Sequence, residues 1–192
     1  MTQERALKTR ASLLAVAATE FAVHSYAAAS ISKILDDSAC TKGAMYFHFT
    51  SKQQLAGAVC DVAAEVYSAI AVRWCPATGM DPLDAITGLV DDAAQAFVAE
   101  VAVRAETRLG FEPEFRDRNP LRAWEAAALD LAKRAVESSL LREGFTAEKF
   151  VRVLSVSLVG NRLLALSSGL PATIRRDYTE SLDMVLAAAG KP

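Results

Sequence analysis

Residues 30–52 read SISKILDDSACTKGAMYFHFTSK, and this segment contains two short helix signals separated by a break. Ser30 and Thr41 are favourable N-cap residues, and each is followed by apolar residues at helical spacing. Residues 36–40 interrupt that spacing. A short helix, a turn of three or four residues and a second short helix have the geometry of a helix-turn-helix, whose second helix enters the DNA major groove. The segment therefore predicts a DNA-binding element.

The two faces of the second helix support this interpretation. At 100° per residue, Met45 and Phe49 point together toward a core, while Gly43, Ala44 and Phe47 lie on the opposite face. Small residues on that face let the backbone approach base edges, and a phenyl ring offers apolar contact to a thymine methyl group.

Four further residues of this helix are placed to contact DNA. Tyr46 and His48 project to either side, where phosphates would lie, and Thr41 and Lys42 stand at the helix start, where backbone N–H groups favour phosphate. Each residue taken singly is more often an ordinary core or surface residue. Three exposed rings on one short helix nevertheless indicate a partner.

Helical spacing continues through the rest of the chain, and no stretch has the alternation of a half-buried strand. We expect an all-α fold of about nine helices. A helix-turn-helix head would span residues 1–50, and a ligand-binding and dimerisation domain would span 51–192. Further helices are expected at 7–24, 51–74 (the connector), 82–101, 103–109, 120–143, 146–168 and 171–190.

Composition limits the alternatives. The net charge is −2, but residues 1–52 carry six basic and four acidic side chains against fifteen and nineteen in the remainder. Cys40, Cys60 and Cys75 have neither disulfide nor metal-site spacing. The two histidines, His24 and His48, both lie in the head, and no catalytic motif is present. We expect no enzyme, no metal site and no cofactor.

Residues 1–5 lack a secretory signal pattern, and no run of 18 uncharged apolar residues occurs. We therefore expect a cytoplasmic protein without a membrane partner.

Residues 41–55, TKGAMYFHFTSKQQL, resemble the recognition-helix signature of TetR-type repressors, and the resemblance covers most of residues 5–60. The form Lys-Gly-Ala-Met-Tyr-Phe-His-Phe is most similar to the γ-butyrolactone autoregulator receptors of that family. The resemblance implies that Lys42 reads bases and that Tyr46, His48 and Lys52 contact phosphates. The full implied set of DNA contacts is Ser30, Thr41, Lys42, Gly43, Ala44, Tyr46, Phe47, His48 and Lys52.

Two residues depart from the family pattern. Ser25 and Ala39 stand where glycine is usual, and both positions are expected to need a positive φ. We expect these two departures to change which operator sequence is bound, but not to prevent DNA binding.

In the second domain, Trp124 is flanked by small residues that leave room beside its ring, and the resemblance places it in a ligand pocket. Phe97, Leu109 and Ser157 are assigned to the same pocket, although a hydroxyl bonded to its own helix is the commoner role for a serine like Ser157. Helix 146–168 is apolar nearly all round, which predicts a partner subunit on one side.

One short helix reads only a few base pairs, so we expect a homodimer, formed through the last two long helices, on a palindromic double-stranded DNA operator. The effector would be a γ-butyrolactone-type signal. Three alternatives stay open: a pseudo-receptor for another apolar compound, such as an antibiotic or its precursor, an architectural helical protein without a ligand, and a helical enzyme.

Overall fold

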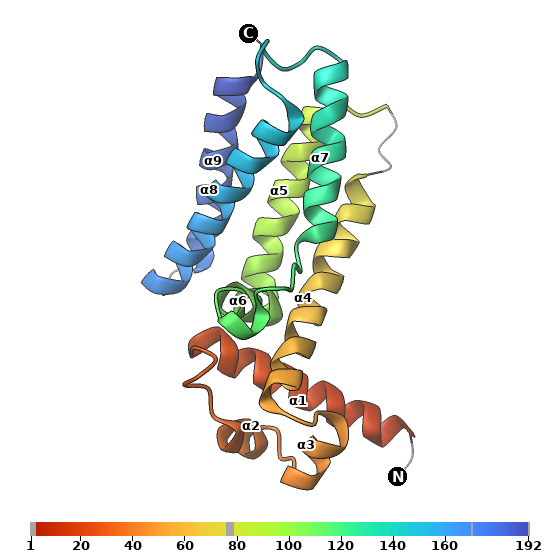
Figure 1. Cartoon of the computed structure of the whole chain (residues 1–192), viewed down its shortest axis with the longest axis vertical. Helices are drawn as coiled ribbons and strands as arrows, with labels where there is room; N and C mark the ends of the chain where they lie inside the picture. Colours follow the sequence, from red (N-terminus) through yellow and green to blue (C-terminus); the bar gives the residue numbers. More distant parts are fainter. Residues whose placement is uncertain (1–2, 76–78, 170, 192) are drawn as a thin grey trace. The chain divides into compact units, whose positions relative to one another are not determined.

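The computed structural model describes residues 3–75, 79–169 and 171–191 of the chain. These residues form α-helices, which Figure 1 labels, and short 3₁₀ helices (η). Their bounds are α1 (Gln3–Val23), α2 (Ile31–Asp37), α3 (Lys42–His48), α4 (Lys52–Trp74), α5 (Pro82–Ala99), α6 (Val101–Leu109), η1 (Pro113–Phe115), α7 (Arg122–Glu137), α8 (Ala147–Ser168), η2 (Pro171–Thr173) and α9 (Ile174–Ala189). The predicted all-α class and the expected nine α-helices are confirmed for the described residues.

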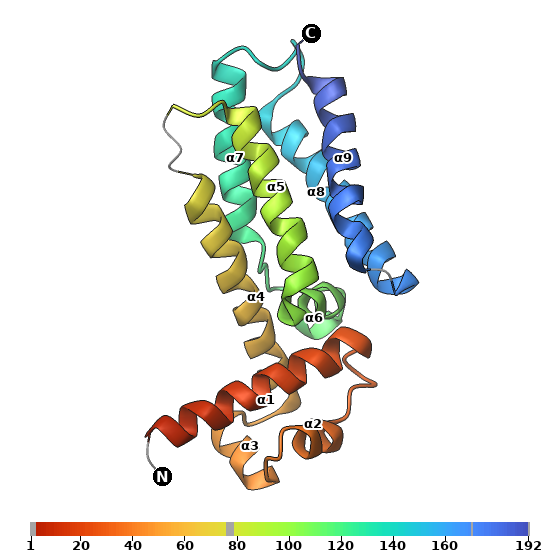
Figure 2. The ribbon, with the colours of Figure 1, turned by 180° about the vertical axis from the view of Figure 1, so that it is seen from behind.

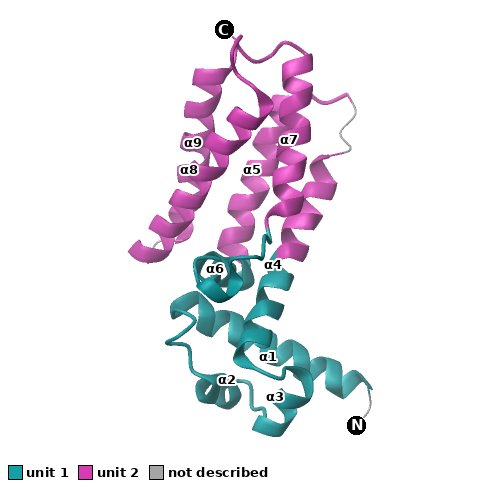
Figure 3. Cartoon of the chain, viewed as in Figure 1, with its two compact units in different colours: residues 1–63, 100–120 teal, residues 64–99, 121–192 magenta. Residues whose placement is uncertain are grey.

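The helices form two compact units, coloured separately in Figure 3. Unit 1 contains residues 1–63 and 100–120, and unit 2 contains residues 64–99 and 121–192. These bounds differ from the expected division at residue 50, because the first turns of α4 and the whole of α6 pack into the core of the head. The functional division at that residue stays a prediction.

In unit 1, α1 packs along α6 and also contacts α2 and α3. Its core joins residues that are far apart in sequence, among them Phe21, Ile34, Met45, Phe49 and Leu109. The apolar side of each short helix therefore closes onto α1, as the spacing in α3 predicts.

In unit 2, α5 packs against α7 and α9, and α8 packs against α7 and α9. Figures 1 and 2 show α8 and α9 side by side from both directions. Helical spacing predicts one inner face of α7, and its members are all buried: Trp124, Ala128, Leu131 and Ala135.

Two expectations about the helices were wrong. Helical spacing predicts one apolar face of α1, formed by Leu7, Ala11, Leu14, Ala18 and Phe21. Leu7 and Ala11 are exposed instead, because the buried face of α1 begins only at Leu13. The helix expected to reach residue 143 ends at Glu137. Ser139 has a left-handed φ of 58°, and the Leu140 N–H returns to the Ala135 carbonyl, which is the pattern of a helix C-cap.

By length and composition, α4 and α8 are apolar enough to cross a membrane. Core helices of globular proteins pass the same test, and both helices bury part of their surface here. The expectation of no membrane partner stays a prediction.

Candidate functional site

Both helices of the predicted helix-turn-helix begin at side-chain caps. The Ser30 hydroxyl oxygen accepts the Lys33 N–H at 3.3 Å, and the Thr41 hydroxyl oxygen accepts the Ala44 N–H at 3.1 Å. Between them, Ala39 takes a left-handed φ of 52°, as expected. Ser25 does not share that conformation, so the expected positive φ at Ser25 is wrong. The two-helix segment itself is confirmed.

The rings of α3 divide between the core and the surface. Met45 and Phe49 are buried in the core of unit 1. Phe47 is 70% exposed and Tyr46 is 47% exposed. Because exposed patches of large apolar side chains commonly mark interaction sites, this face is suited to contact with a partner.

The other expected DNA contacts surround those two rings. Thr41, Lys42 and Gly43 are exposed, whereas Ala44 is half-buried. A Cβ added at Gly43 would meet nothing closer than the Thr41 hydroxyl oxygen, at 4.0 Å. The fold itself therefore does not require glycine there, and the missing side chain leaves the backbone open to a ligand. His48 is half-buried, with its ring edge-on to the Phe47 ring at 5.0 Å between centroids.

The Lys52 ammonium group, expected to contact a phosphate, is bonded within the protein. Its ammonium group donates to the Ala29 carbonyl at 2.6 Å and to the Ala27 carbonyl at 3.3 Å. It also lies 4.9 Å from the centroid of the Tyr26 ring. Burial lowers the pKa of Lys52, against the opposing effect of Glu20. In this structure Lys52 fixes the loop before α2, and a phosphate contact stays a prediction.

Sequence reasoning missed three residues that hold this loop or the end of α1 just before it. The Glu20 carboxylate accepts the Ser30 N–H at 2.9 Å, and the Glu112 carboxylate accepts the Tyr26 N–H at 3.0 Å. Arg108 donates from Nε to the Ala22 carbonyl at 2.8 Å. An acidic residue among buried apolar residues of α1, Glu20, was a signal that the sequence offered. These bonds fix the position from which α2 starts.

Unit 2 contains a small internal cavity beside Trp124. The cavity measures about 20 Å³, and Tyr67, Ser155 and Arg162 also line it. The Trp124 ring is buried, and its indole N–H donates to the Leu89 carbonyl at 3.1 Å. The expected open space beside this ring is therefore present but small.

The other expected pocket residues do not join Trp124. Leu109 lies in the core of unit 1, because α6 packs on α1. Phe97 is buried in α5 but does not line the cavity. Ser157 donates to the Val153 carbonyl of its own helix. Ser155, two residues earlier and about 200° away around α8, lines the cavity instead.

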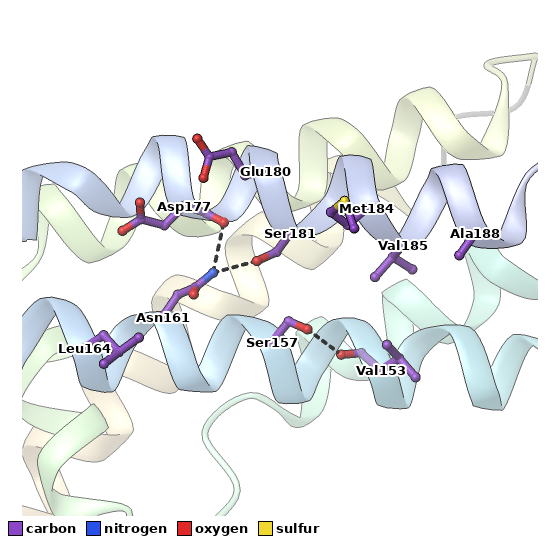
Figure 4. A pocket seen from close by; sticks show the side chains of 10 residues that line it. All are labelled: Val153, Ser157, Asn161, Leu164, Asp177, Glu180, Ser181, Met184, Val185 and Ala188. Carbon is purple, nitrogen blue, oxygen red and sulfur yellow. Dashed lines mark hydrogen bonds between the residues drawn. The ribbon is translucent and has the colours of Figure 1, made fainter.

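Ser157 borders a groove between α8 and α9, drawn in Figure 4. Asn161 crosses between these helices, because its amide donates to the Asp177 carbonyl at 2.9 Å and to the Ser181 hydroxyl at 2.8 Å. The groove has a volume of about 600 Å³, and the apolar Leu164 and Met184 beside it are exposed.

Comparisons with known proteins agree on one family. Residues 13–59 match the model of the bacterial regulatory proteins of the tetR family. The A-factor receptor protein of Streptomyces griseus is 27% identical over 191 residues, which cover 99% of this chain and 67% of that receptor. The solved structure of the TetR family protein CprB from S. coelicolor A3(2) is 26% identical, with a TM-score of 0.82 and coverage of 98% and 91%.

A solved γ-butyrolactone receptor, described as ArpA-like, is 26% identical, with a TM-score of 0.75 and coverage of 94% of this chain and 98% of that one. These likenesses extend beyond the helix-turn-helix into unit 2. Sequence signature, fold and comparisons agree: the N-terminal segment matches the tetR-family model, and nearly the whole chain is similar to the A-factor receptor protein, to CprB and to the ArpA-like receptor.

Proposed function

We propose that this protein is a transcriptional repressor that binds a palindromic DNA operator as a homodimer and leaves it when a small molecule binds unit 2. The TetR-family match and the similarity to the A-factor receptor support this function. It is a binding function without catalysis or a cofactor. A protein that acts on chromosomal DNA would work in the bacterial cytoplasm.

The outward exposure of Tyr46 and Phe47 on α3 is the observation that carries the proposal. The opposite side of the same helix is fixed in the core by Met45 and Phe49, so the exposed rings have a defined direction. Lys42 stands at the start of this face as an exposed cation. Such a surface fits a major groove, where rings meet thymine methyl groups and an ammonium meets guanine.

Selection of bound duplexes from random DNA at a fixed salt concentration tests this function. We expect a palindrome whose half-sites lie about one helical turn apart. Phe47→Ala should then weaken operator binding about tenfold or more, because an apolar base contact is lost. The matched control is Phe111→Ala, since Phe111 is 62% exposed in the same unit but outside α3. Enrichment of no duplex, or equal losses in both variants, would contradict the proposal.

The dimer is proposed to form through the exposed apolar face of α8 and α9. Val156, Leu164 and Met184 are all exposed there. Leu164→Glu should give a monomer in sedimentation and should weaken operator binding, because a buried interface tolerates no unpaired charge. Val72→Glu is the control, since Val72 is 71% exposed on α4. A dimer that survives Leu164→Glu unchanged would place the interface elsewhere.

The effector is proposed to be a γ-butyrolactone-type signal, because the A-factor receptor and the ArpA-like receptor are similar over nearly the whole chain. Titration of γ-butyrolactones into the operator complex should lower operator affinity. If none does so, this effector class is excluded, and the pseudo-receptor alternative for another apolar compound takes its place. That result would leave the proposed binding of the operator by the ligand-free protein in place.

A further inference from the structure

The N-terminal part of α1 extends beyond the core of unit 1. The buried residues of α1 begin at Leu13, whereas residues 3–12 are exposed or half-buried, and Leu7 among them is 61% exposed. The tetR-family model matches residues 13–59 and so also begins at Leu13. We call residues 3–12 the α1 overhang. It is a helical extension of about three turns that the head does not bury and that the matched family segment does not include.

The α1 overhang lies beside the helix-turn-helix. The guanidinium carbon of Arg10 is 5.4 Å from the centroid of the Phe49 ring, directly after the last residue of α3. The Ser12 hydroxyl oxygen is 3.5 Å from the Ser38 carbonyl oxygen, at the end of α2. Figures 1 and 2 show the N-terminal end of α1 on the α3 side of unit 1, and α1 contacts α3. The overhang is therefore continuous with the proposed DNA-binding surface.

Two cations of the overhang project from the face of α1 that meets α2. Arg5 precedes Ser12 by seven residues, so it lies about 20° from Ser12 around the helix and about 10 Å further along it. Lys8 precedes Ser12 by four residues and lies about 40° to the other side. Both cations are exposed. Lys8 pairs with Glu4 at 2.8 Å, whereas Arg5 has no ion pair with any residue that the structure describes.

The α1 overhang carries the positive charge that the two-helix segment lacks. Residues 3–12 contain three basic and one acidic side chain, a net charge of +2. Residues 30–51 contain two basic and two acidic side chains, a net charge of zero with histidine neutral. Cations on phosphates supply a large part of the affinity of proteins for DNA. Because α3 presents rings rather than net charge, the overhang is the part of the head best suited to attract the phosphate backbone.

We propose that the α1 overhang is a second DNA-binding element, which contacts the phosphate backbone next to the half-site that α3 reads. The planar guanidinium group of Arg5 binds phosphate oxygens, and Lys8 adds a second charge when phosphate replaces Glu4 as its partner. Arg10 remains on the Phe49 ring and holds the overhang against the end of α3. This inference rests on the proposed function and adds contact residues from outside the matched family segment.

The salt dependence of operator binding tests this contact, because it counts the cations that neutralise phosphates. Arg5→Gln should weaken binding of the selected operator about threefold to tenfold, and it should reduce the slope of log affinity against log salt by about 1. The preferred base sequence should not change, since phosphate contacts carry no sequence information. Glu4→Gln should strengthen binding, because it removes an acidic group and leaves Lys8 unpaired.

Arg116→Gln is the matched control. Arg116 is exposed and lies in unit 1 but outside both the α1 overhang and the helix-turn-helix, so this variant loses the same charge at a different place. It should keep the salt slope of the wild type. Equal reductions of the slope in Arg5→Gln and Arg116→Gln would show a general effect of net charge and would overturn the contact.

The length of the duplex locates the contact. An overhang of about 15 Å spans about five base pairs, so we compare an operator that ends at its half-sites with one that continues by that length on each side. Wild type and Arg116→Gln should bind the longer duplex more tightly, whereas Arg5→Gln should show a smaller difference. A wild-type protein that binds both duplexes equally well would overturn the overhang contact and leave the proposed function in place. A wild-type protein that selects no DNA would overturn both.

Discussion

The indole ring of Trp74, at the end of α4, occupies the space that a side chain at Gly88 of α5 would need. A Cβ added at Gly88 would lie 2.1 Å from the nearest ring carbon. The ring is held in place because its N–H donates to the Asp92 carboxylate at 2.7 Å. The end of α4 is therefore attached to α5 through a contact that requires glycine.

We predict that Gly88→Ala destabilises the protein by about 1–3 kcal/mol, because the new methyl group displaces the Trp74 ring. Helix propensity alone would favour alanine by about 1 kcal/mol, so the sign of the change identifies the packing. Urea unfolding measures it. Gly43→Ala in α3 is the control, since its added Cβ would meet only the Thr41 hydroxyl oxygen, at 4.0 Å. Equal effects in the two variants would argue against the packing of Trp74 on Gly88.

The buried thiol of Cys60 makes stability depend on pH. Burial raises the pKa of the Cys60 thiol to about 12, and the Glu106 carboxylate adds to the shift. The unfolded thiol has a pKa of about 8.5, so the folded state holds the proton more tightly. Its contribution to stability is complete below that unfolded pKa and is lost as pH rises toward the folded value. We predict that the free energy of unfolding falls more steeply above about pH 9 in wild type than in Cys60→Ala. Parallel pH profiles would contradict this.

Thiol alkylation distinguishes the same cysteine from its neighbours. Cys75 is exposed, Cys40 is half-buried and Cys60 is buried. Because only the thiolate reacts, we predict that folded protein at pH about 8 is modified at Cys75 first and at Cys60 last. Peptide mass spectrometry locates the label, and protein unfolded in urea should show equal labelling of all three. Early labelling of Cys60 would mean that unit 1 opens locally.

Lys52 stabilises the head through the loop before α2. Its ammonium group has two carbonyl acceptors and the Tyr26 ring as partners. We predict that Lys52→Met destabilises the protein by about 1–2 kcal/mol, since these bonds are partly buried. Lys33→Met is the control, because the Lys33 ammonium group pairs with Asp37 in an exposed bridge four residues away along α2. Thermal unfolding compares them, and equal melting temperatures would contradict a structural role for Lys52.

The helix-turn-helix was predictable because its signals are local. Ser30 and Thr41 cap their helices through residues three positions on, and helical spacing alone separates the buried Met45 from the exposed Phe47. The outcome at these positions depends on few residues outside the segment. The sequence pattern therefore predicted both the elements and the free face of α3.

The positions that the sequence could not place depend on contacts between distant parts of the chain. Leu109 has the apolar character of a pocket residue, but α6 packs on α1, and this pairing has no local signature. From the sequence, Ser155 and Ser157 are equally plausible as residues that line the cavity beside Trp124. The rotation of α8 about its own axis decides between them, and that rotation is set by packing against α7 and α9. Lys52 could be recognised as a cation but not as the partner of two loop carbonyls.

The two residues that replace the usual glycines, Ala39 between α2 and α3 and Ser25 between α1 and α2, differ in backbone conformation and offer a last prediction. Ala39 has a left-handed φ of 52°, which costs a residue with a Cβ about 1 kcal/mol. Ala39→Gly should therefore stabilise the protein by up to that amount, less the entropy that glycine adds to the unfolded chain.

Ser25→Gly should have the opposite sign. Ser25 lacks a left-handed φ, and its hydroxyl oxygen accepts the Ala28 N–H at 3.3 Å, so glycine removes a bond and relieves no strain. Urea unfolding of both variants gives the two signs, and operator binding of Ala39→Gly shows whether the turn keeps its geometry. A loss of stability in Ala39→Gly would mean that the left-handed turn at this position is not the one the protein adopts in solution.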